Sequence, residues 1–240
     1  MFYAARTLAR IGADARVGAS CSLRDRADLL PVLESFGLPV HWHESSTTTA
    51  YTFHYEGDRR IMRQDAVGDP WTTAEALEAV ADAEWVHVGA LVRTDFPEDT
   101  LERLAAGGRR LLLDAQGLVR TPDIGPLRTD GDIADVLRHV TVLKLSDEEA
   151  EAIVGSAEPA KLQALDVSEI ILTLGSRGSV VVTKDRIEHI FARDVVGPVD
   201  PTGAGDTFSA AYLAARTTGS APRDAANEAT IAVAAFLTGE

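Results

Sequence analysis

Two different spacings of apolar residues divide this chain. In the first part, apolar positions recur every three or four residues over 4–10 and again over 29–36, which predicts two short helices. Gly12 and Gly37 follow these segments, and glycine is common just after the end of a helix. The segment 15–19, between the two helices, is predicted to be a strand.

Residues 38–65 follow the alternation of a β-sheet. Three segments, 40–43, 50–55 and 59–63, alternate apolar and polar residues, and no helical pattern separates them. Strands joined without an intervening helix favour antiparallel pairing. The sequence therefore predicts a small antiparallel sheet over residues 38–65, set apart from a larger unit made of residues 1–37 and 66–240.

After Trp71, near-continuous apolar strands alternate with helices. Strands are predicted at 85–88, 111–114, 140–144 and 170–174, and helices at 73–81, 100–106, 133–137 and 147–154. A hairpin over 178–191 and two alanine-rich helices, near 208–216 and 221–236, follow. This order is typical of a doubly wound α/β domain, in which helices cover both faces of a mainly parallel sheet.

The amino-acid composition limits which binding partners and which cellular compartment are expected for this chain. The chain has 240 residues, 45% of them hydrophobic, and a formal net charge of -14. Such an acidic surface argues against nucleic acid and against a membrane as partners, and no stretch reaches the ~20 apolar residues of a membrane helix. The single cysteine, Cys21, cannot form an intrachain disulfide and favours a reducing, cytoplasmic location. A phosphate site in this chain has to be built locally, from backbone amides, a few arginines and a divalent cation.

The segment Asp200-Pro201-Thr202-Gly203-Ala204-Gly205-Asp206-Thr207-Phe208 carries the strongest chemical signal. Small residues placed directly before a helix leave unpaired N–H groups that bind anions. An Asp in that first turn can accept a proton from a hydroxyl while the amides hold a phosphoryl oxygen. The same residues are also ordinary turn and helix-start chemistry, so local pattern alone leaves both interpretations open.

This segment resembles the C-terminal signature D-T-x-G-A-G-D of the ribokinase/PfkB carbohydrate kinase family, with Pro201 where the family usually has Thr. The resemblance implies a ribokinase-like fold whose small sheet is a lid, and an ATP-dependent transfer of a phosphoryl group to a sugar, polyol or nucleoside. It implies that Asp206 is the catalytic base and that the backbone of Gly203, Ala204, Gly205 and Asp206 forms the anion hole.

Three further segments are matched to the nucleotide and metal sites of the family. Thr173, Gly175 and Gly178 match its T-L-G-x-x-G loop, which implies that this loop, with Ser176 inside it, contacts the nucleotide. Asn227 falls where the family often has a residue that touches the nucleoside, and Lys144 is assigned to the same nucleotide site.

Glu149 matches the Glu of an N-x-x-E motif, which implies a role in organising Mg²⁺ through water. Ser146 replaces the Asn, and Ser146 with Glu149 also forms a capping box, a purely structural alternative.

Polar residues follow the predicted strand 111–114. Asp114, Gln116 and Arg120 leave the carboxyl end of this strand, where ligands of open α/β sheets gather. A surface loop with a salt bridge explains them equally well. The family resemblance places the corresponding loop between sugar and phosphate, which makes these residues candidates for acceptor binding.

The start of the chain differs from the family pattern. The family begins with a strand, a Gly-Gly-x-x-x-Asn segment and an early Asp that binds sugar hydroxyls, whereas residues 4–10 here match the helix that comes next. The resemblance therefore implies that the main sugar-binding residues are missing from these 240 residues. A non-catalytic nucleotide- or metabolite-binding relative, or a fragment of a kinase, is thus the alternative to an active kinase. A homodimer through the lid is also implied by the family.

Overall fold

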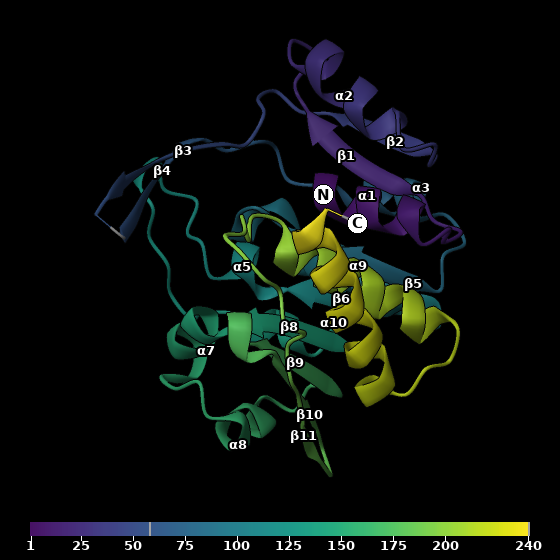
Figure 1. Ribbon diagram of the computed structural model, residues 1–240. Helices are drawn as coiled ribbons and strands as arrows, with labels where there is room; N and C mark the ends of the chain where they lie inside the picture. The colour runs from purple at the N-terminus through teal and green to yellow at the C-terminus, as the bar shows by residue number, and fades with distance from the viewer. Residues whose placement is uncertain (58, 240) are drawn as a thin grey trace.

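The computed structural model describes residues 1–57 and 59–239. A sheet of six strands in the order β11-β10-β9-β8-β6-β5 organises most of the chain (Figure 1). β5, β6, β8 and β9 are parallel, and β10 and β11 are added antiparallel. The bounds are β5 Trp85–Val88, β6 Arg110–Asp114, β8 Val142–Ser146, β9 Glu169–Thr173, β10 Ser179–Thr183 and β11 Ile187–Ile190.

Helices cover both faces of this sheet, as the doubly wound pattern predicted (Figure 1). Successive strand residues point to opposite faces, so Leu111 and Leu113 enter one buried cluster and Leu112 the other. On the first face lie α3 Thr73–Val80, α4 Glu98–Ala105, α6 Ala134–Leu137, α7 Asp147–Val154 and α8 Pro159–Leu162. The second face is covered by α9 Ala204–Thr217 and α10 Pro222–Thr238, whose many alanines allow close packing.

The N-terminal part forms a separate two-stranded parallel sheet. α1 Phe2–Arg10 is followed by β1 Val17–Cys21, α2 Arg26–Glu34 and β2 Val40–Glu44, and β1 pairs with β2 in register. The prediction that residues 40–43 belong to the antiparallel sheet is therefore wrong. A helix precedes β2, so the chain returns to pair parallel with β1, and local alternation cannot distinguish the two pairings.

The small antiparallel sheet has a different third strand. β3 Ala50–Glu56 and β4 Arg59–Ala66 pair as predicted, and β4 also pairs with β7 Gly125–Pro126. Gln64 of β4 is completely buried, and its amide donates to the carbonyls of Thr121 and Asp123. A long-range contact, rather than the sequence pattern, thus attaches this sheet to the loop that follows β6.

The remaining helical elements are short: α5 Ala115–Leu118, and the 3₁₀ turns η1 Arg93–Asp95, η2 Ala106–Gly108, η3 Gln163–Leu165 and η4 Gly175–Arg177. Within the described part of the chain, no helix has the length and apolar character needed to cross a bilayer.

Candidate functional site

The first turn of α9 lies beyond the carboxyl ends of the central strands. Gly203 precedes the helix with φ +89°, a backbone conformation that favours glycine. The N–H of Ala204 donates to the Pro201 carbonyl, and the first helical bond runs from Thr207 to Gly203. The amides of Gly205 and Asp206 are therefore the two first-turn donors that the helix itself cannot pair. Of the residues predicted to form an anion hole, Gly203 to Asp206, these two have amides without a backbone acceptor among the described residues.

Asp206 is the third residue of α9, so its carboxylate lies in the first turn as predicted. Its side chain is 32% exposed, and the amino group of Met1 lies 3.8 Å from Oδ2. A partly exposed carboxylate beside two free amides can accept a proton from a hydroxyl that approaches the same point.

A buried ion pair lies under this turn. Asp114 and Lys144 are cross-strand neighbours on β6 and β8, and Lys144 Nζ donates to both carboxylate oxygens of Asp114, at 3.1 and 3.3 Å. Burial by itself raises the pKa of Asp114, but the ammonium of Lys144, His87 and the Gln116 N–H together outweigh it and hold that pKa below its ordinary value. Burial likewise opposes the charge of Lys144, and the attraction of Asp114 and Glu149 still raises its pKa. The pair is therefore ionised.

Glu149 and Ser146 form the capping box that the sequence predicted. Ser146 Oγ accepts from the Glu149 N–H at 3.2 Å, and Glu149 Oε2 accepts from the Ser146 N–H at 2.8 Å. Burial raises the pKa of Glu149, and the charge of Asp114 adds to this, although Lys144 acts in the opposite sense. The structural interpretation of this motif is confirmed, and Glu149 Oε1 is outside the capping bonds.

The site offers few protein ligands for a magnesium ion. Among the residues described, no group of three or more His, Cys, Asp or Glu could hold a metal ion. Mg²⁺ usually keeps several waters and binds to one or two carboxylates together with substrate phosphates. Glu149 can supply such a carboxylate, so the residues present fit a donor-bound Mg²⁺ and not a metal caged by protein alone.

The loop after β9 takes the glycine-dependent conformation that its sequence requires. Gly175 and Gly178 have φ of +58° and +94°, and the Leu174 N–H donates to the Gly178 carbonyl at 2.8 Å. Thr173 Oγ1 donates to the Leu145 carbonyl at 3.2 Å, while Ser176 is exposed at the tip. The end of β9 thus carries an ordered loop, and Arg177 of this loop donates to Asp147 of α7, the helix that carries Glu149.

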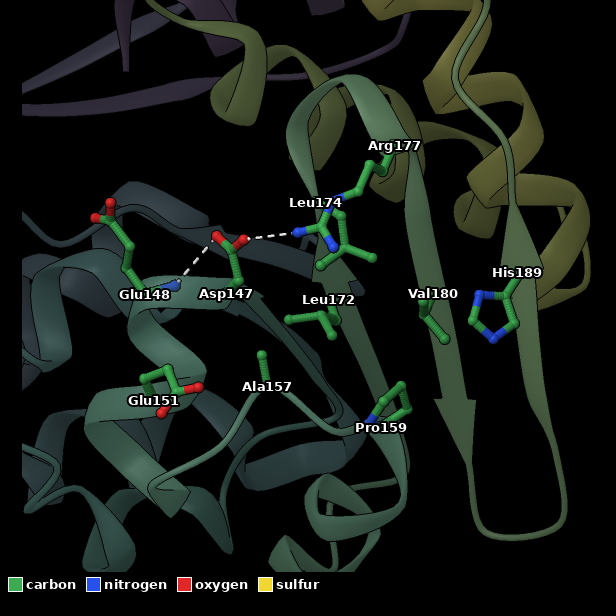
Figure 2. A pocket seen from close by; sticks show the side chains of 10 residues that line it. All are labelled: Asp147, Glu148, Glu151, Ala157, Pro159, Leu172, Leu174, Arg177, Val180 and His189. Atoms are coloured by element: carbon green, nitrogen blue, oxygen red, sulfur yellow. Dashed lines mark hydrogen bonds and ion pairs between the residues drawn. The ribbon is translucent and has the colours of Figure 1, made fainter. Parts of the chain in front are cut away.

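A cavity of about 470 Å³ opens beside this loop, between α7 and the strands β9 to β11 (Figure 2). Arg177 of the loop donates to Asp147 at 3.0 Å, which joins the loop to the start of α7. Figure 2 shows three acidic residues of α7 on one side of the cavity and His189 of β11 on the other. The cavity lies on the face opposite α9 and α10, because Leu172 and Val180 at its floor belong to the first buried cluster.

Asn227 lies on the other side of the sheet from this cavity. It is half-buried on α10, the helix that packs along α9 and against β10. The structure therefore puts Asn227 on the same face as the first turn of α9, and the Arg177 cavity on the opposite face.

The predicted acceptor residues separate into two environments. Gln116 lies in α5, and its N–H donates to Asp114 Oδ1 at 3.1 Å. Arg120 is buried, its guanidinium lies 4.9 Å from the centre of the Tyr51 ring, and Tyr51 Oη donates to the Leu91 carbonyl at 2.7 Å. Arg120 is therefore not an exposed loop residue with a salt bridge; it joins the small sheet to the site.

Sequence reasoning did not single out His87. It lies on β5 on the same sheet face as Asp114 and Lys144, and its Nε2 is buried without a hydrogen-bond partner among the described residues. Burial lowers its pKa, against the attraction of Asp114. A histidine in the middle of an apolar strand was the available signal.

His87 also lines a second cavity, of about 690 Å³. This cavity lies between the two-stranded sheet and β5, the edge strand of the six-stranded sheet, and Met1 and Leu91 reach it. A cavity of this size holds a small metabolite. One of its lining residues is Met1, whose amino group lies 3.8 Å from Asp206 Oδ2.

Comparison with known proteins gives a consistent result. The model of the pfkB family carbohydrate kinases matches residues 4–239. Ribokinase of Bacillus subtilis is 29% identical over 202 residues, which cover 82% of this chain and 65% of the relative. Inositol 3-kinase of Zea mays is 33% identical over 190 residues, 77% of this chain and 47% of the relative. The chain thus spans about half to two thirds of the length of these two relatives.

This chain also resembles a solved structure in its fold. A pyrophosphate-dependent kinase in the ribokinase family, in complex with sulfate, superposes with a TM-score of 0.86 over 98% of this chain and 85% of that chain, at 24% identity. At this identity the likeness shows the fold alone, and it confirms the predicted ribokinase-like architecture.

Proposed function

This chain belongs to the pfkB family of carbohydrate kinases, and we propose from that premise that it transfers the terminal phosphoryl group of ATP to a hydroxyl of a sugar, polyol or nucleoside. One observation supports this most strongly. The first turn of α9 carries two unpaired amides and the half-exposed Asp206 directly above the Lys144–Asp114 pair.

In this proposal Asp206 takes the proton of the acceptor hydroxyl. The acceptor oxygen forms a bond to the terminal phosphorus, the bond from that phosphorus to the bridging oxygen breaks, and the bridging oxygen leaves with the electron pair as part of ADP. The amides of Gly205 and Asp206 bind the phosphoryl oxygens while charge develops on them. The proton on Asp206 then passes to solvent.

The charge of the donor also has to be neutralised. Mg²⁺ held on the donor phosphates would supply Lewis-acid charge, with Glu149 as its protein carboxylate. The loop of Thr173, Gly175, Ser176 and Gly178 is proposed to contact the donor from the end of β9, with Asn227 of α10 near the nucleoside.

The acceptor is proposed to bind in the 690 Å³ cavity. His87 lines this cavity and has a ring nitrogen without a hydrogen-bond partner among the described residues, and Leu91, whose carbonyl accepts from Arg120, also lines it. We propose Gln116 and Arg120 of the loop after β6 as further acceptor contacts. The similarity to an inositol 3-kinase favours polyols within the acceptor class. We propose that β3, β4 and β7 act as the lid, since the contact of Tyr51 with Arg120 couples their position to the site.

We also propose a homodimer formed through this lid, because β3 is an edge strand of the small sheet and Phe53 on it is 57% exposed. The buried free thiol of Cys21 supports a reducing compartment, and so the cytoplasm. Sedimentation equilibrium of the chain and of a variant with Phe53→Asp would test the dimer.

The test is a coupled assay for ADP release over sugars, polyols and nucleosides, with a parallel phosphate-release assay that uses pyrophosphate as donor. Asp206→Asn should lower kcat on an identified acceptor by about 10²- to 10⁴-fold and leave donor affinity nearly unchanged, since a general base contributes that much. Asp224→Asn is the matched control, because Asp224 is an exposed acid in the first turn of α10.

Near-normal turnover by Asp206→Asn would overturn the assignment of the base. Donor binding by the unaltered chain without transfer to any acceptor class would support the non-catalytic alternative. Transfer from pyrophosphate but not ATP would correct the donor and leave the site intact.

A further inference from the structure

Lys144 lies directly against the first turn of α9. A Cβ atom placed on Gly205 would be 3.1 Å from Lys144 Nζ and 3.8 Å from Lys144 Cε. The ammonium is therefore packed beside the residue whose amide is one of the two free donors of the anion hole. Lys144 is only 5% exposed, so little solvent screens its charge.

The position of Lys144 follows from the register of the sheet. Asp114 of β6 pairs with Lys144 of β8, which pairs in turn with Ile171 of β9. Ile171 belongs to the apolar cluster under α9, so these three cross-strand neighbours change from apolar to charged beneath the start of α9. A lysine at this register position can only direct its ammonium toward that helix or into the core.

The surrounding charges are mostly negative. Lys144 is bonded to Asp114, and the charges of Glu149 and Asp206 also act on its ammonium. A phosphate or pyrophosphate group entering the site meets these three carboxylates, and the α9 terminus offers only partial positive charge against them. Lys144 is a buried full cation in contact with this turn, and its Nζ donates to both carboxylate oxygens of Asp114.

We propose that Lys144 is a positioning residue of the phosphate site: its ammonium supports the first turn of α9 at Gly205 and supplies the permanent positive charge that makes this turn bind a phosphate group. Asp114 accepts from this ammonium and partly offsets its charge, which gives Asp114 an electrostatic role beyond the acceptor contact predicted for it. This inference rests on the proposed function for the identity of the anion, and its test does not require turnover.

The test measures pyrophosphate binding, by calorimetry and by the shift in Tm that pyrophosphate produces, without acceptor. Lys144→Met should weaken pyrophosphate binding about 10- to 100-fold, the factor expected when one interaction with a charged group is lost. Asp114→Asn should do the opposite and strengthen it several-fold, because it removes a negative charge and leaves the cation. The two substitutions thus have opposite expected signs, which loss of packing cannot produce.

Lys144→Met leaves the buried carboxylate of Asp114 unpaired, and the variant can fail to fold for that reason. The double variant Lys144→Met/Asp114→Asn removes both charges while nearly keeping the side-chain shapes. It should fold and bind pyrophosphate more weakly than the unaltered chain. Lys161→Met is the matched control, because Lys161 is an exposed lysine on α8 with the same charge.

Equal pyrophosphate affinity in the double variant and the unaltered chain would overturn the inference, as would weaker binding by Asp114→Asn. An unaltered chain that shows no binding of pyrophosphate would overturn it too. Binding with the expected order of variants, but no transfer to any acceptor, would instead overturn the proposed kinase activity and leave the phosphate site standing.

Discussion

Gly203, directly before the first turn of α9, leaves no room for even a single added methyl group. It has φ +89°, and a Cβ there would overlap the ring of Tyr3 on α1. Two costs therefore follow from Gly203→Ala. The left-handed backbone costs about 1–2 kcal/mol for a residue with a Cβ, and overpacking against Tyr3 adds about 1–3 kcal/mol. The expected loss of unfolding free energy is the combination, about 2–5 kcal/mol.

Gly219 separates the two costs. Its φ is +91°, nearly the same, but nothing lies within 4 Å of a Cβ placed there. Gly219→Ala should therefore lose only the backbone part, about 1–2 kcal/mol. The double variant Tyr3→Ala/Gly203→Ala should recover about 1–3 kcal/mol relative to the sum of the single variants, because the overlap is gone.

The assay is urea unfolding at equilibrium, followed by circular dichroism, for all four variants. We expect Gly203→Ala also to lower kcat more than Gly219→Ala, since α1 would push the first turn of α9 away from the strands. Equal losses of stability in the two glycine variants, or no coupling with Tyr3, would show that the α1 contact does not constrain this turn.

Three further predictions concern stability and are checked by urea unfolding. Ser146→Ala removes one bond of the capping box of α7 and should lower the free energy of unfolding by about 0.5–2 kcal/mol. Thr72→Ala in the capping box of α3 should have the same effect. Unchanged stability in either variant would show that its cap does not stabilise the helix. Glu169→Gln should cost about 3 kcal/mol, because Glu169 accepts from both Arg216 and Tyr212 in a mostly buried network; a loss below 1 kcal/mol would contradict this. The pKa of Asp114 is lowered in the fold, so its contribution to stability is present above the ordinary value near 3.8 and is lost as pH falls below it. Stability measured from pH 7 to pH 3 should therefore fall less steeply in Lys144→Met/Asp114→Asn than in the unaltered chain.

Several features of the site were predictable because they depend on a short run of residues. The helix start at 203–206 follows from Gly-Ala-Gly before an alanine-rich run, the capping box from Ser and Glu three residues apart, and the loop after β9 from its two glycines. Helix bounds differed by a few residues: α9 begins at Ala204, before the predicted residue 208, since the start is set by Gly203 and by bonds to Pro201.

Features that depend on distant parts of the chain were not predictable in this way. Residues 40–44 alternate like a lid strand, and yet β2 pairs with β1, because the choice of partner depends on the crossover through α2. The third strand of the small sheet comes from residues 125–126, more than 50 residues later, and is fixed by the buried amide of Gln64. His87 acquires its place beside Asp114 only when β5 and β6 pair.

Spacing and residue type were enough to predict the alternation of strands and helices, the acidic composition and the motif of each loop. The tertiary structure alone decided that Lys144 is a buried ammonium against Gly205, since neither its strand register nor its partner Asp114 is encoded next to it. Gly203 to Asp206 predicted an anion site from local chemistry, and the pairing of β6 with β8 decided which full charge lies beneath it.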